Sequence, residues 1–351
     1  MIQAKLDRIA VIMMSAIGDA VHVLPVITAL KRHAPSSHIT WLLQPGPASL
    51  VRGHPEVDEI VVVDRKGGLG AFTAAARALR AQPFDLVLDL QVYIKAGLLT
   101  ALSRAPVKLG FDRVRARDAN WLFTTHRIPP HAPQHVQDQY FEFLTALGVA
   151  AEPVRWHLGP WESERAAQRT FFAHVPRPAV TLVIGSTHRE KEWLPERWAE
   201  LSDALCNDFG LQPILAGGRS PRELATERAI LDRVRHRPIS TLGASLRELV
   251  SIIDGSALVI SLDTAPLHMA VALDRPVVSL MGYNNPKRVG PYRHSLDLIV
   301  DAYGDPGEAY PISLTHRLGR MGKIGVRDVL ERVERWRTDE ERGTRKNGGE
   351  S

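Results

Sequence analysis

The chain of 351 residues contains a single cysteine, and only 6% of its residues are aromatic. One cysteine cannot form a disulfide within the chain, which agrees with a reducing compartment. Cys206 stands inside a helical pattern, "LSDALCNDFG", so we expect a core residue rather than a nucleophile. The sequence also lacks an apolar run near the roughly 18 residues of a membrane span, and its first residues show no secretory cleavage pattern. These absences predict a globular protein of the cytoplasm.

Two further absences narrow the function. No G-x-G-x-x-G follows the first strand pattern or the strand pattern at 179–185, which disfavours a dinucleotide-dependent oxidoreductase. No set of His, Cys, Asp or Glu residues has the spacing of a metal site. The formal net charge of +5 is small for this length, and it favours acidic partners without indicating nucleic acid. We therefore predict no metal ligands and no nucleic-acid partner.

The sequence does contain a long alternation of short β-branched runs and helical patterns, interrupted once by a stretch rich in proline, tryptophan and charge. Such alternation predicts parallel sheets covered by helices, and the length fits two domains better than one. We expect an N-terminal Rossmann-like domain at 1–150, a linker at 151–177, a C-terminal Rossmann-like domain at 178–335 and a disordered tail at 338–351. The last helical pattern, at 326–342, could pack back on the N-terminal domain.

The stretch "SLDTAPLHMAVALDRP", at 261–276, runs from a buried strand into a helix. Asp263 and Thr264 stand where the strand ends, and Pro266 belongs in the first helical turn, where its missing N–H costs nothing. The helix start then presents open amides and a positive dipole end to a phosphate, and His268 can add a donor. The alternative is a helix cap formed by Thr264 or Asp263, with His268 in the core. This stretch alone does not decide between them.

A second strand end occurs in "VIGSTHREKEWLPERW", where the strand pattern ends at Gly185. The following loop offers Ser186, Thr187 and Lys191, and such hydroxyls and cations suit the dispersed negative charge of a diphosphate. Surface loops are polar in any case, so this loop is a weak signal by itself.

The third strand end lies in "RIAVIMMSAIGDAVHVLPVITAL", where Asp19 stands at the start of a helix. Most carboxylates at such a position are helix caps. A carboxylate that faces a bound sugar can instead act as a general base and take a proton from an attacking hydroxyl. Nothing local separates the two interpretations.

Together the three strand ends resemble one known family. "SxxGDxxHxLPxxxAL" near the N-terminus, "K.W..ERWAEL" after the linker and "SLDTAPLHMAVALDRPVVSLMG" near the end are similar to the lipopolysaccharide heptosyltransferases, glycosyltransferase family 9, and most like heptosyltransferase I. The resemblance covers roughly residues 8 to 335. It implies a GT-B architecture, with two Rossmann-like domains facing each other across a cleft. It also implies an inverting transfer of heptose from ADP-heptose to the Kdo and heptose inner core of lipopolysaccharide, with Kdo-lipid A as the expected acceptor.

The resemblance also implies roles for individual residues. Asp19 would deprotonate the acceptor hydroxyl, and Lys191 would support catalysis by stabilising the departing ADP. The remaining donor-binding positions that match the family are Ser186, Thr187, Glu223, Asp263, Thr264, Ala265 and His268. Because a lysine and a helix dipole are available at the diphosphate, no cofactor is expected, with at most a stimulation by Mg²⁺.

On the acceptor side, the segment 95–135 is rich in basic residues and contains only Asp112 and Asp118 as acids. Its basic residues are Lys95, Arg104, Lys108, Arg113, Arg115, Arg117, His126, Arg127, His131 and His135. A segment of this kind is by default a solvated face. Three of these residues match family positions that contact the acidic acceptor: Lys95, Arg117 and His135. The same positive face could hold the protein peripherally on the anionic cytoplasmic surface of the inner membrane.

The chain departs from the family in two places. Ala265 and Pro266 follow the Asp-Thr pair where the family usually has glycine, and the segment after Asp64 is shorter than the basic insertion of the first-heptose enzymes. Three alternatives therefore stay open at this point. They are a family member with another acceptor, a nucleotide-sugar epimerase of the same architecture, and a non-catalytic module that binds an anionic polysaccharide or nucleic acid.

Overall fold

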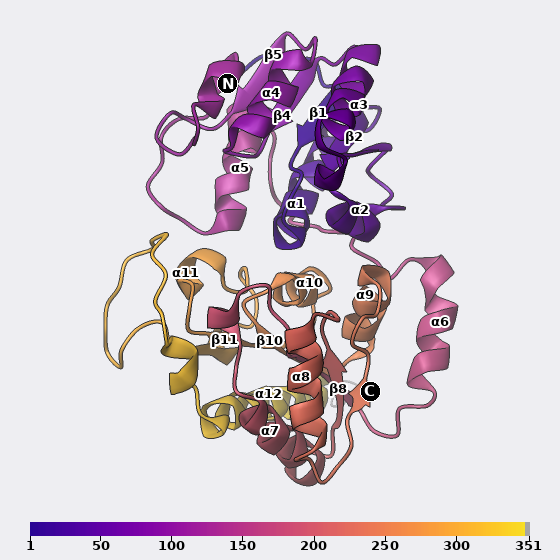
Figure 1. The fold of residues 1–351 in the computed structure, drawn as a ribbon, viewed down its shortest axis with the longest axis vertical. Coiled ribbons are helices and arrows are strands. Elements are labelled where there is room, and N and C mark those ends of the chain that lie inside the picture. Colours follow the sequence, from indigo (N-terminus) through magenta and orange to yellow (C-terminus); the bar gives the residue numbers. More distant parts are fainter. Residues whose placement is uncertain (348–351) are drawn as a thin grey trace. The chain divides into compact units, whose positions relative to one another are not determined.

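The computed structural model describes residues 1–347 and divides into two compact units, Met1–Leu158 (unit 1) and a second unit that begins at Gly159 (unit 2). Each unit contains one six-stranded sheet covered by helices (Figure 1). The predicted fold class of two parallel α/β domains is confirmed. The division between the units lies inside the segment expected as a linker, and that segment also contains a helix, α6 (Glu162–Phe172).

Unit 1 has the strand order β3-β2-β1-β4-β5-β6, and the neighbouring strands pair in parallel. Its strands are β1 (Arg8–Ile12), β2 (His38–Leu43), β3 (Glu59–Val62), β4 (Leu86–Asp89), β5 (Val107–Gly110) and β6 (His126–Arg127). Its helices are α1 (Ile17–His33), α2 (Pro45–Val51), α3 (Gly68–Ala81), α4 (Ile94–Leu102) and α5 (Val136–Leu147), with the 3₁₀ turns η1 (Arg65–Gly67) and η2 (Asn120–Phe123).

Unit 2 has the order β12-β11-β10-β7-β8-β9, again with parallel pairs. Its strands are β7 (Ala179–Val183), β8 (Gln212–Ala216), β9 (Ile239–Ser240), β10 (Leu258–Leu262), β11 (Val277–Met281) and β12 (Ile299–Asp301). Besides α6, its helices are α7 (Pro195–Asp208), α8 (Pro221–Leu231), α9 (Leu246–Gly255), α10 (Ala265–Ala272), α11 (Pro286–Val289) and α12 (Val326–Asn347). The 3₁₀ turns are η3 (Arg189–Lys191), η4 (Leu296–Leu298) and η5 (Arg320–Lys323).

The central strands are buried because helices cover both faces of each sheet. Residues 9–12 of β1 and 258–262 of β10 are fully buried, as their runs of Val, Ile and Leu predict for strands in the middle of a parallel sheet. In unit 2 one face carries the core formed with α7, α8 and α12, and α9 packs on the other face. Cys206 is buried on α7, which confirms the prediction of a core cysteine.

Both sheets have the same topology. Counting strands within each unit, both have the order 3-2-1-4-5-6, and this order reverses between β1 and β4 in unit 1 and between β7 and β10 in unit 2. In open parallel sheets, ligands bind beyond the carboxyl ends of the strands at such a reversal. The fold therefore directs attention to four strand ends, two in each unit.

One expectation about the end of the chain was wrong. The segment 338–347 continues helix α12 rather than forming a disordered tail, and the rest of the predicted tail, 348–351, lies outside the described residues. Within unit 2, α12 packs against α7, β11 and β12. Val326, Val329 and Val333 are buried in the core of unit 2 because they repeat at helical spacing along one face of α12.

Candidate functional site

In unit 2 the structure brings together two residues from different strand ends, Lys191 after β7 and Asp263 after β10. The Lys191 Nζ lies 2.9 Å from Asp263 Oδ2 and donates a hydrogen bond of 3.0 Å to the Asp263 carbonyl oxygen. Their side chains are 14% and 7% exposed, so this ion pair is largely shielded from water. Lys191 is therefore held against the strand end that leads into α10.

Asp263 has a second partner that the sequence analysis missed. The Asn284 Nδ2, from the loop after β11, donates a hydrogen bond of 2.5 Å to Asp263 Oδ2, and His316 Nδ1 lies 2.7 Å from Asn284 Oδ1. Because Asn284 uses its amide nitrogen on the carboxylate, its oxygen must accept, so His316 carries a proton on Nδ1. The Tyr283 ring stacks on His316 with ring centroids 4.8 Å apart. The available signal for Asn284 was its place in the loop that follows a buried strand, three residues after Met281.

The start of α10 matches each of the two interpretations in one respect. Thr264 is the N-cap residue, but its side chain makes no capping hydrogen bond; the hydroxyl donates to the Leu262 carbonyl at 3.4 Å. Ala265 and Pro266 form the first turn, as predicted for Pro266. His268 is buried, with 8% of its surface exposed, so it faces the protein more than solvent.

The loop after β7 places its two hydroxyl residues differently. Ser186 is buried and its Oγ accepts from the His188 N–H at 3.2 Å, whereas Thr187 is exposed. Arg222, in the first turn of α8, donates to the Ser186 and Thr187 carbonyl oxygens at 3.4 Å and 3.3 Å. Arg222 is thus a second cation beside this loop, and the sequence analysis did not select it because it comes from a different strand-to-helix connection.

Glu223 lies at the same edge of the sheet, but its carboxylate caps its own helix. It accepts from the Gly218 N–H at 2.6 Å and from the Ser220 N–H at 3.0 Å, and it occupies the space that a side chain at position 185 would need. Burial alone would raise the pKa of Glu223, but the hydrogen bonds from Ser220 and Gly218 outweigh burial and hold this pKa below its usual value. Glu223 is therefore a carboxylate next to the end of β7, within reach of the Ser186 loop.

In unit 1, Asp19 is the third residue of α1 and is half-buried. Its Oδ2 accepts from the N–H of the N-cap residue, Ala16, at 2.9 Å, and the Tyr140 hydroxyl of α5 donates to its Oδ1 at 3.3 Å. Asp19 thus contributes to capping from inside the helix rather than as the N-cap residue. Both oxygens are oriented by these bonds while the side chain keeps some exposure to solvent.

The three expected acceptor residues lie on two parts of unit 1. Lys95 on α4 and Arg117 before η2 are exposed and belong to adjoining segments, because the Arg117 N–H donates to the carbonyl oxygen of Val92 at 2.8 Å. His135 is the N-cap of α5, and its Nδ1 accepts from the Gln137 N–H at 3.1 Å. An accepting Nδ1 carries no proton, so in this arrangement the His135 proton is on Nε2.

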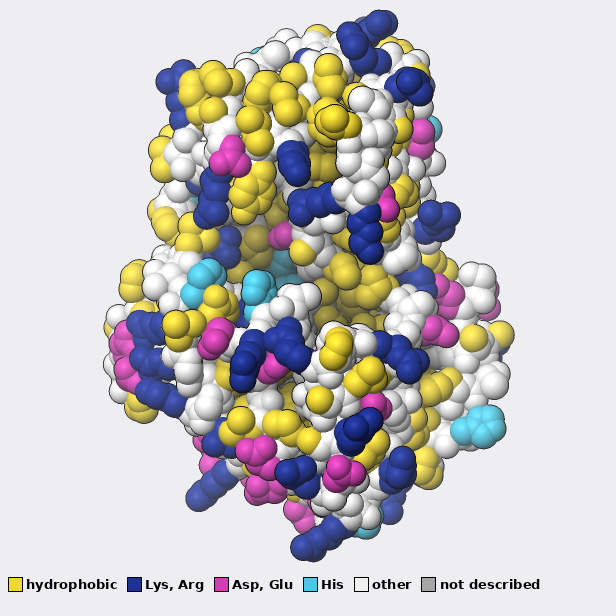
Figure 2. All heavy atoms as spheres, in the orientation of Figure 1, with side chains coloured by type: hydrophobic (Ala, Val, Ile, Leu, Met, Phe, Trp, Pro, Cys, Tyr) yellow, Lys and Arg dark blue, Asp and Glu magenta, His cyan; other side chains and the backbone are white. Residues whose placement is uncertain are grey.

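The positive face around these residues is smaller than the basic segment suggested. Arg115 is not part of it, because its guanidinium forms ion pairs with Asp112 and with Glu142 of α5, the latter at 2.6 Å. Apolar side chains are exposed between the remaining cations, on α4, on η2 and in the loop before η2: Ile94, Leu98, Val114 and Leu122. Figure 2 shows hydrophobic and Lys or Arg side chains interspersed over the part of unit 1 where α4 lies. Among the described residues, no helix is both long and apolar enough to cross a membrane.

A buried acid in unit 1 was also missed. Asp89, the last residue of β4, has no exposed surface, and burial raises its pKa to about 7 against the hydrogen bonds that it accepts. Because "DLVLDL" is an apolar run, Asp89 looked like part of a strand pattern rather than a site residue. It ends the strand next to β1, at the reversal of the strand order.

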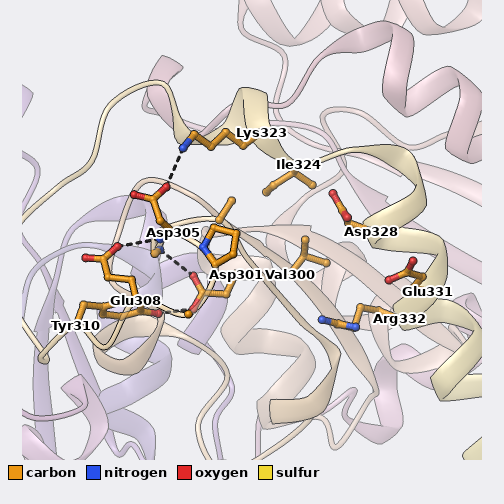
Figure 3. Close-up of a pocket in the computed structure, with 14 residues that line it drawn as sticks. Val300, Asp301, Asp305, Glu308, Tyr310, Lys323, Ile324, Asp328, Glu331 and Arg332 are labelled. Carbon is orange, nitrogen blue, oxygen red and sulfur yellow. Dashed lines mark hydrogen bonds and ion pairs between the residues drawn. The ribbon is translucent and has the colours of Figure 1, made fainter.

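A separate pocket of about 530 Å³ lies at the edge strand β12 of unit 2 (Figure 3). Two of its acidic residues are paired with cations: Lys323 Nζ lies 2.9 Å from Asp305, and Arg317 lies 2.5 Å from Glu308. Neither Lys191 nor Asp263 lines it. In the part of the chain that the structure describes, no group of three or more His, Cys, Asp and Glu side chains is arranged for a metal ion.

Similarity to known proteins identifies the family of this chain. Residues 72–307, more than half of the chain, match the profile of Glycosyltransferase family 9 (heptosyltransferase). The chain is 27% identical over 340 residues to the lipopolysaccharide core heptosyltransferase OpsX of Haemophilus influenzae, covering 91% of this chain and 97% of that protein.

Two solved structures share the fold. One is a glycosyltransferase of family 9 from Veillonella parvula, with a TM-score of 0.81 and 23% identity over 95% of this chain and 98% of that one. The other is the E. coli heptosyltransferase WaaC with ADP, with a TM-score of 0.74 and 22% identity over 94% of this chain and 99% of that one. With two six-stranded parallel sheets of this kind, the architecture is GT-B. The chain belongs to glycosyltransferase family 9 and is a glycosyltransferase.

Proposed function

We propose that this protein transfers a heptose from ADP-heptose to the inner core of lipopolysaccharide, with Kdo-lipid A as acceptor. Family membership supports the class of reaction, and curated relatives of the chain are named as lipopolysaccharide heptosyltransferases. The single observation that carries the proposal is the Lys191–Asp263 pair at the strand-order reversal of unit 2. It places a shielded cation next to the start of α10, which suits a diphosphate leaving group.

The proposed reaction is a single displacement with inversion at the anomeric carbon. The acceptor hydroxyl oxygen attacks that carbon, Asp19 takes the hydroxyl proton, and the bond from the carbon to the diphosphate oxygen breaks as ADP leaves with the electron pair. Asp19 suits the role of base because two hydrogen bonds orient its carboxylate and the side chain is only half-buried.

On the donor side, Lys191 would stabilise the negative charge that develops on the ADP diphosphate. Asp263 and Asn284 keep its ammonium group in place, and Ser186, Thr187 and Arg222 line the adjoining loop. Ala265 and His268 belong to the helix whose N-terminus would face the phosphates, and Glu223 would contact the ribose. No cofactor is part of the proposal. A stimulation by Mg²⁺ is compatible with it, since a divalent cation can screen a diphosphate.

On the acceptor side, Lys95, Arg117 and His135 would contact the carboxylates and phosphates of Kdo-lipid A. We further propose that this face of unit 1 rests on the anionic cytoplasmic surface of the inner membrane. Leu122 and Val114, 62% and 85% exposed, would enter the interface, and Arg113 and Arg127 beside the Trp121 ring would meet lipid phosphates.

The decisive experiment for the transfer is a panel of donors and acceptors followed by mass spectrometry of the products. With ADP-heptose and Kdo-lipid A, the proposal expects ADP to form in step with the loss of acceptor and with a product heavier by one heptose. A free sugar without loss of acceptor would contradict transfer and favour an epimerase or a hydrolase. If a product forms with another core acceptor but not with Kdo-lipid A, heptose transfer is supported and Kdo-lipid A is rejected as the acceptor.

Membrane contact is tested by sedimentation with vesicles of phosphatidylglycerol and phosphatidylethanolamine, compared with vesicles of phosphatidylcholine alone. We expect binding to the anionic vesicles, and we expect the double variant Val114→Ser, Leu122→Ser to lose most of it. Leu314→Ser and Leu318→Ser, at exposed leucines of unit 2, provide the matched control. Equal sedimentation of the wild type and the Val114, Leu122 variant would contradict the proposed face.

A further inference from the structure

Asp89 stands where three segments of unit 1 meet. Its carboxyl group accepts from the Thr100 hydroxyl of α4 at 2.9 Å, from the Asn120 amide of η2 at 3.2 Å, and from the N–H of Gln91, in the β4–α4 loop, at 3.3 Å. All three donors are neutral. The carboxyl group is fully buried, so these hydrogen bonds replace the water that it would otherwise bind.

One partner of Asp89, Asn120, also forms hydrogen bonds with the segments that carry the expected acceptor residues Lys95 and Arg117. The Asn120 amide also donates to the carbonyl oxygen of Tyr93 at 2.9 Å, two residues before Lys95. The Asn120 N–H donates to the carbonyl oxygen of Arg117 at 2.9 Å. Lys95 and Arg117 are therefore held through backbone that Asn120 binds, and Asn120 is in turn bound by Asp89.

The same group of residues reaches the start of α1. Gln91, whose N–H binds Asp89, donates from its side-chain amide to the carbonyl oxygen of Ser15 at 3.0 Å. Ser15 directly precedes Ala16, whose N–H binds the carboxylate of Asp19. One buried carboxyl group thus connects, through two short chains of hydrogen bonds, the segments of Lys95 and Arg117 with the segment of Asp19.

Close packing reinforces this connection. A side chain at Gly97 of α4 would come within 2.5 Å of the Phe123 ring of η2, so α4 and η2 touch where Asp89 binds both. Thr100 and Asn120 are buried like Asp89. Loss of the carboxyl group would leave buried donors without an acceptor, and such groups relax by moving toward water.

We propose that Asp89 is a positioning residue for the acceptor side of the reaction: it keeps Lys95 and Arg117 at a set spacing from Asp19. Asp89 itself touches no substrate in this assignment. The inference rests on the proposed function for the identity of the acceptor, while the structural link between the segments stands on the contacts above. Because reaction rates fall steeply when reacting groups shift by about 1 Å, such a residue affects catalysis without contacting the substrate.

Steady-state kinetics with the full-length protein test the role. Asp89→Ala is expected to raise the KM for the acceptor by about tenfold and to change the KM for ADP-heptose less than about twofold. Thr100→Val removes only one hydroxyl group from the contacts of Asp89. It should raise the KM for the acceptor by about threefold and leave the KM for ADP-heptose nearly unchanged. Thr28→Val is the matched control, since Thr28 is also a buried threonine of unit 1 but donates to Pro25 and Arg155 instead. Equal rises in both KM values would overturn the proposal.

Hydrogen exchange separates this inference from the proposed function, because it needs no substrate. Backbone amides at 91–95 and 117–120 should exchange at least about tenfold faster in Thr100→Val or Asp89→Ala than in the wild type, while those of β2 stay unchanged. Unchanged exchange in these segments would reject the positioning role even if transfer is confirmed. Faster exchange together with a wild type that does not use Kdo-lipid A would retain the structural link between the segments and reject the proposed acceptor. If Asp89→Ala does not fold, hydrogen exchange of Thr100→Val alone tests the positioning role.

Discussion

Asp89 and Asp263 occupy equivalent places in the two units, each at the carboxyl end of the fourth strand of its sheet. Both are buried, at 0% and 5% exposure. Within residues 1–347, Asp89 is bound only by the neutral donors described above, and its pKa rises to about 7, whereas Asp263 is paired with the Lys191 ammonium at 2.9 Å. The shared topology therefore places a carboxyl group at the same position in each unit. The neighbouring loops determine whether that group accepts hydrogen bonds from neutral donors or pairs with a cation.

The loops after the first strand of each unit explain this difference. In unit 1, β1 leads within a few residues into α1, and that connection presents the acid Asp19. In unit 2, β7 leads into a longer loop with the turn η3, which presents the cation Lys191. The acid after the first strand of unit 1 matches the proposed base, and the cation after the first strand of unit 2 matches the proposed leaving-group site.

The largest expected effect comes from Asp19. Asp19→Asn should reduce kcat by about 10²- to 10⁴-fold, because an amide cannot take the hydroxyl proton, while it can still accept from the Ala16 N–H. Rates of ADP release in the presence of acceptor are the measurement. Unchanged turnover would mean that Asp19 only caps the start of α1 and is not the general base. Asp7→Asn, an acid of the same unit before β1, is the control.

Next in size is the loss of the Lys191 charge. Lys191→Met leaves Asp263 buried without its cation, which should lower the free energy of unfolding by about 3 to 5 kcal/mol in denaturant titrations. Adding Asp263→Asn should restore part of that loss because the unpaired charge is then removed. If Lys191→Met unfolds like the wild type, the pair is not the shielded ion pair that distinguishes Asp263 from Asp89.

The raised pKa of Asp89 predicts that the stability of the protein depends on pH. The folded state binds the Asp89 proton up to a pKa of about 7, compared with the ordinary 3.8, so the free energy of unfolding falls as the pH rises from about 4 to about 7. The contribution is at most about 4 kcal/mol. Denaturant titrations of wild type and Asp89→Asn across this range should therefore diverge, with the variant losing less stability. Parallel curves would show that Asp89 does not hold its proton in this way.

The smallest effect is expected at the departure from the family pattern. Ala265→Gly restores the glycine after the Asp-Thr pair and removes one methyl at the start of α10, so the KM for ADP-heptose should change by less than about tenfold. Ala272→Gly, at the other end of the same helix, should leave that KM unchanged and accounts for the lower helix propensity of glycine. A much larger change at Ala265 would mean that the methyl selects the donor.

Much of the secondary structure was predictable because its signals are local. The β-branched runs at 38–43 and 258–262 form strands with those patterns buried, and Pro266 stands in the first turn of α10. Helix α5 was not predicted, and this omission hid Tyr140, which binds Asp19. The polar tail from residue 338 was expected to be disordered, yet α12 continues to Asn347 after burying three valines in the core.

The sequence by itself determined two parallel α/β units and three polar strand ends, because apolar periodicity and strand-to-helix junctions depend on residues that are close together in the sequence. Only the tertiary structure decided which strand ends adjoin, since strand order depends on crossovers between distant segments. That order joined Lys191 to Asp263, 72 residues apart, and Asp89 to Asn120, 31 residues apart. It thereby made one buried carboxylate an ion-pair partner and left the other among neutral donors.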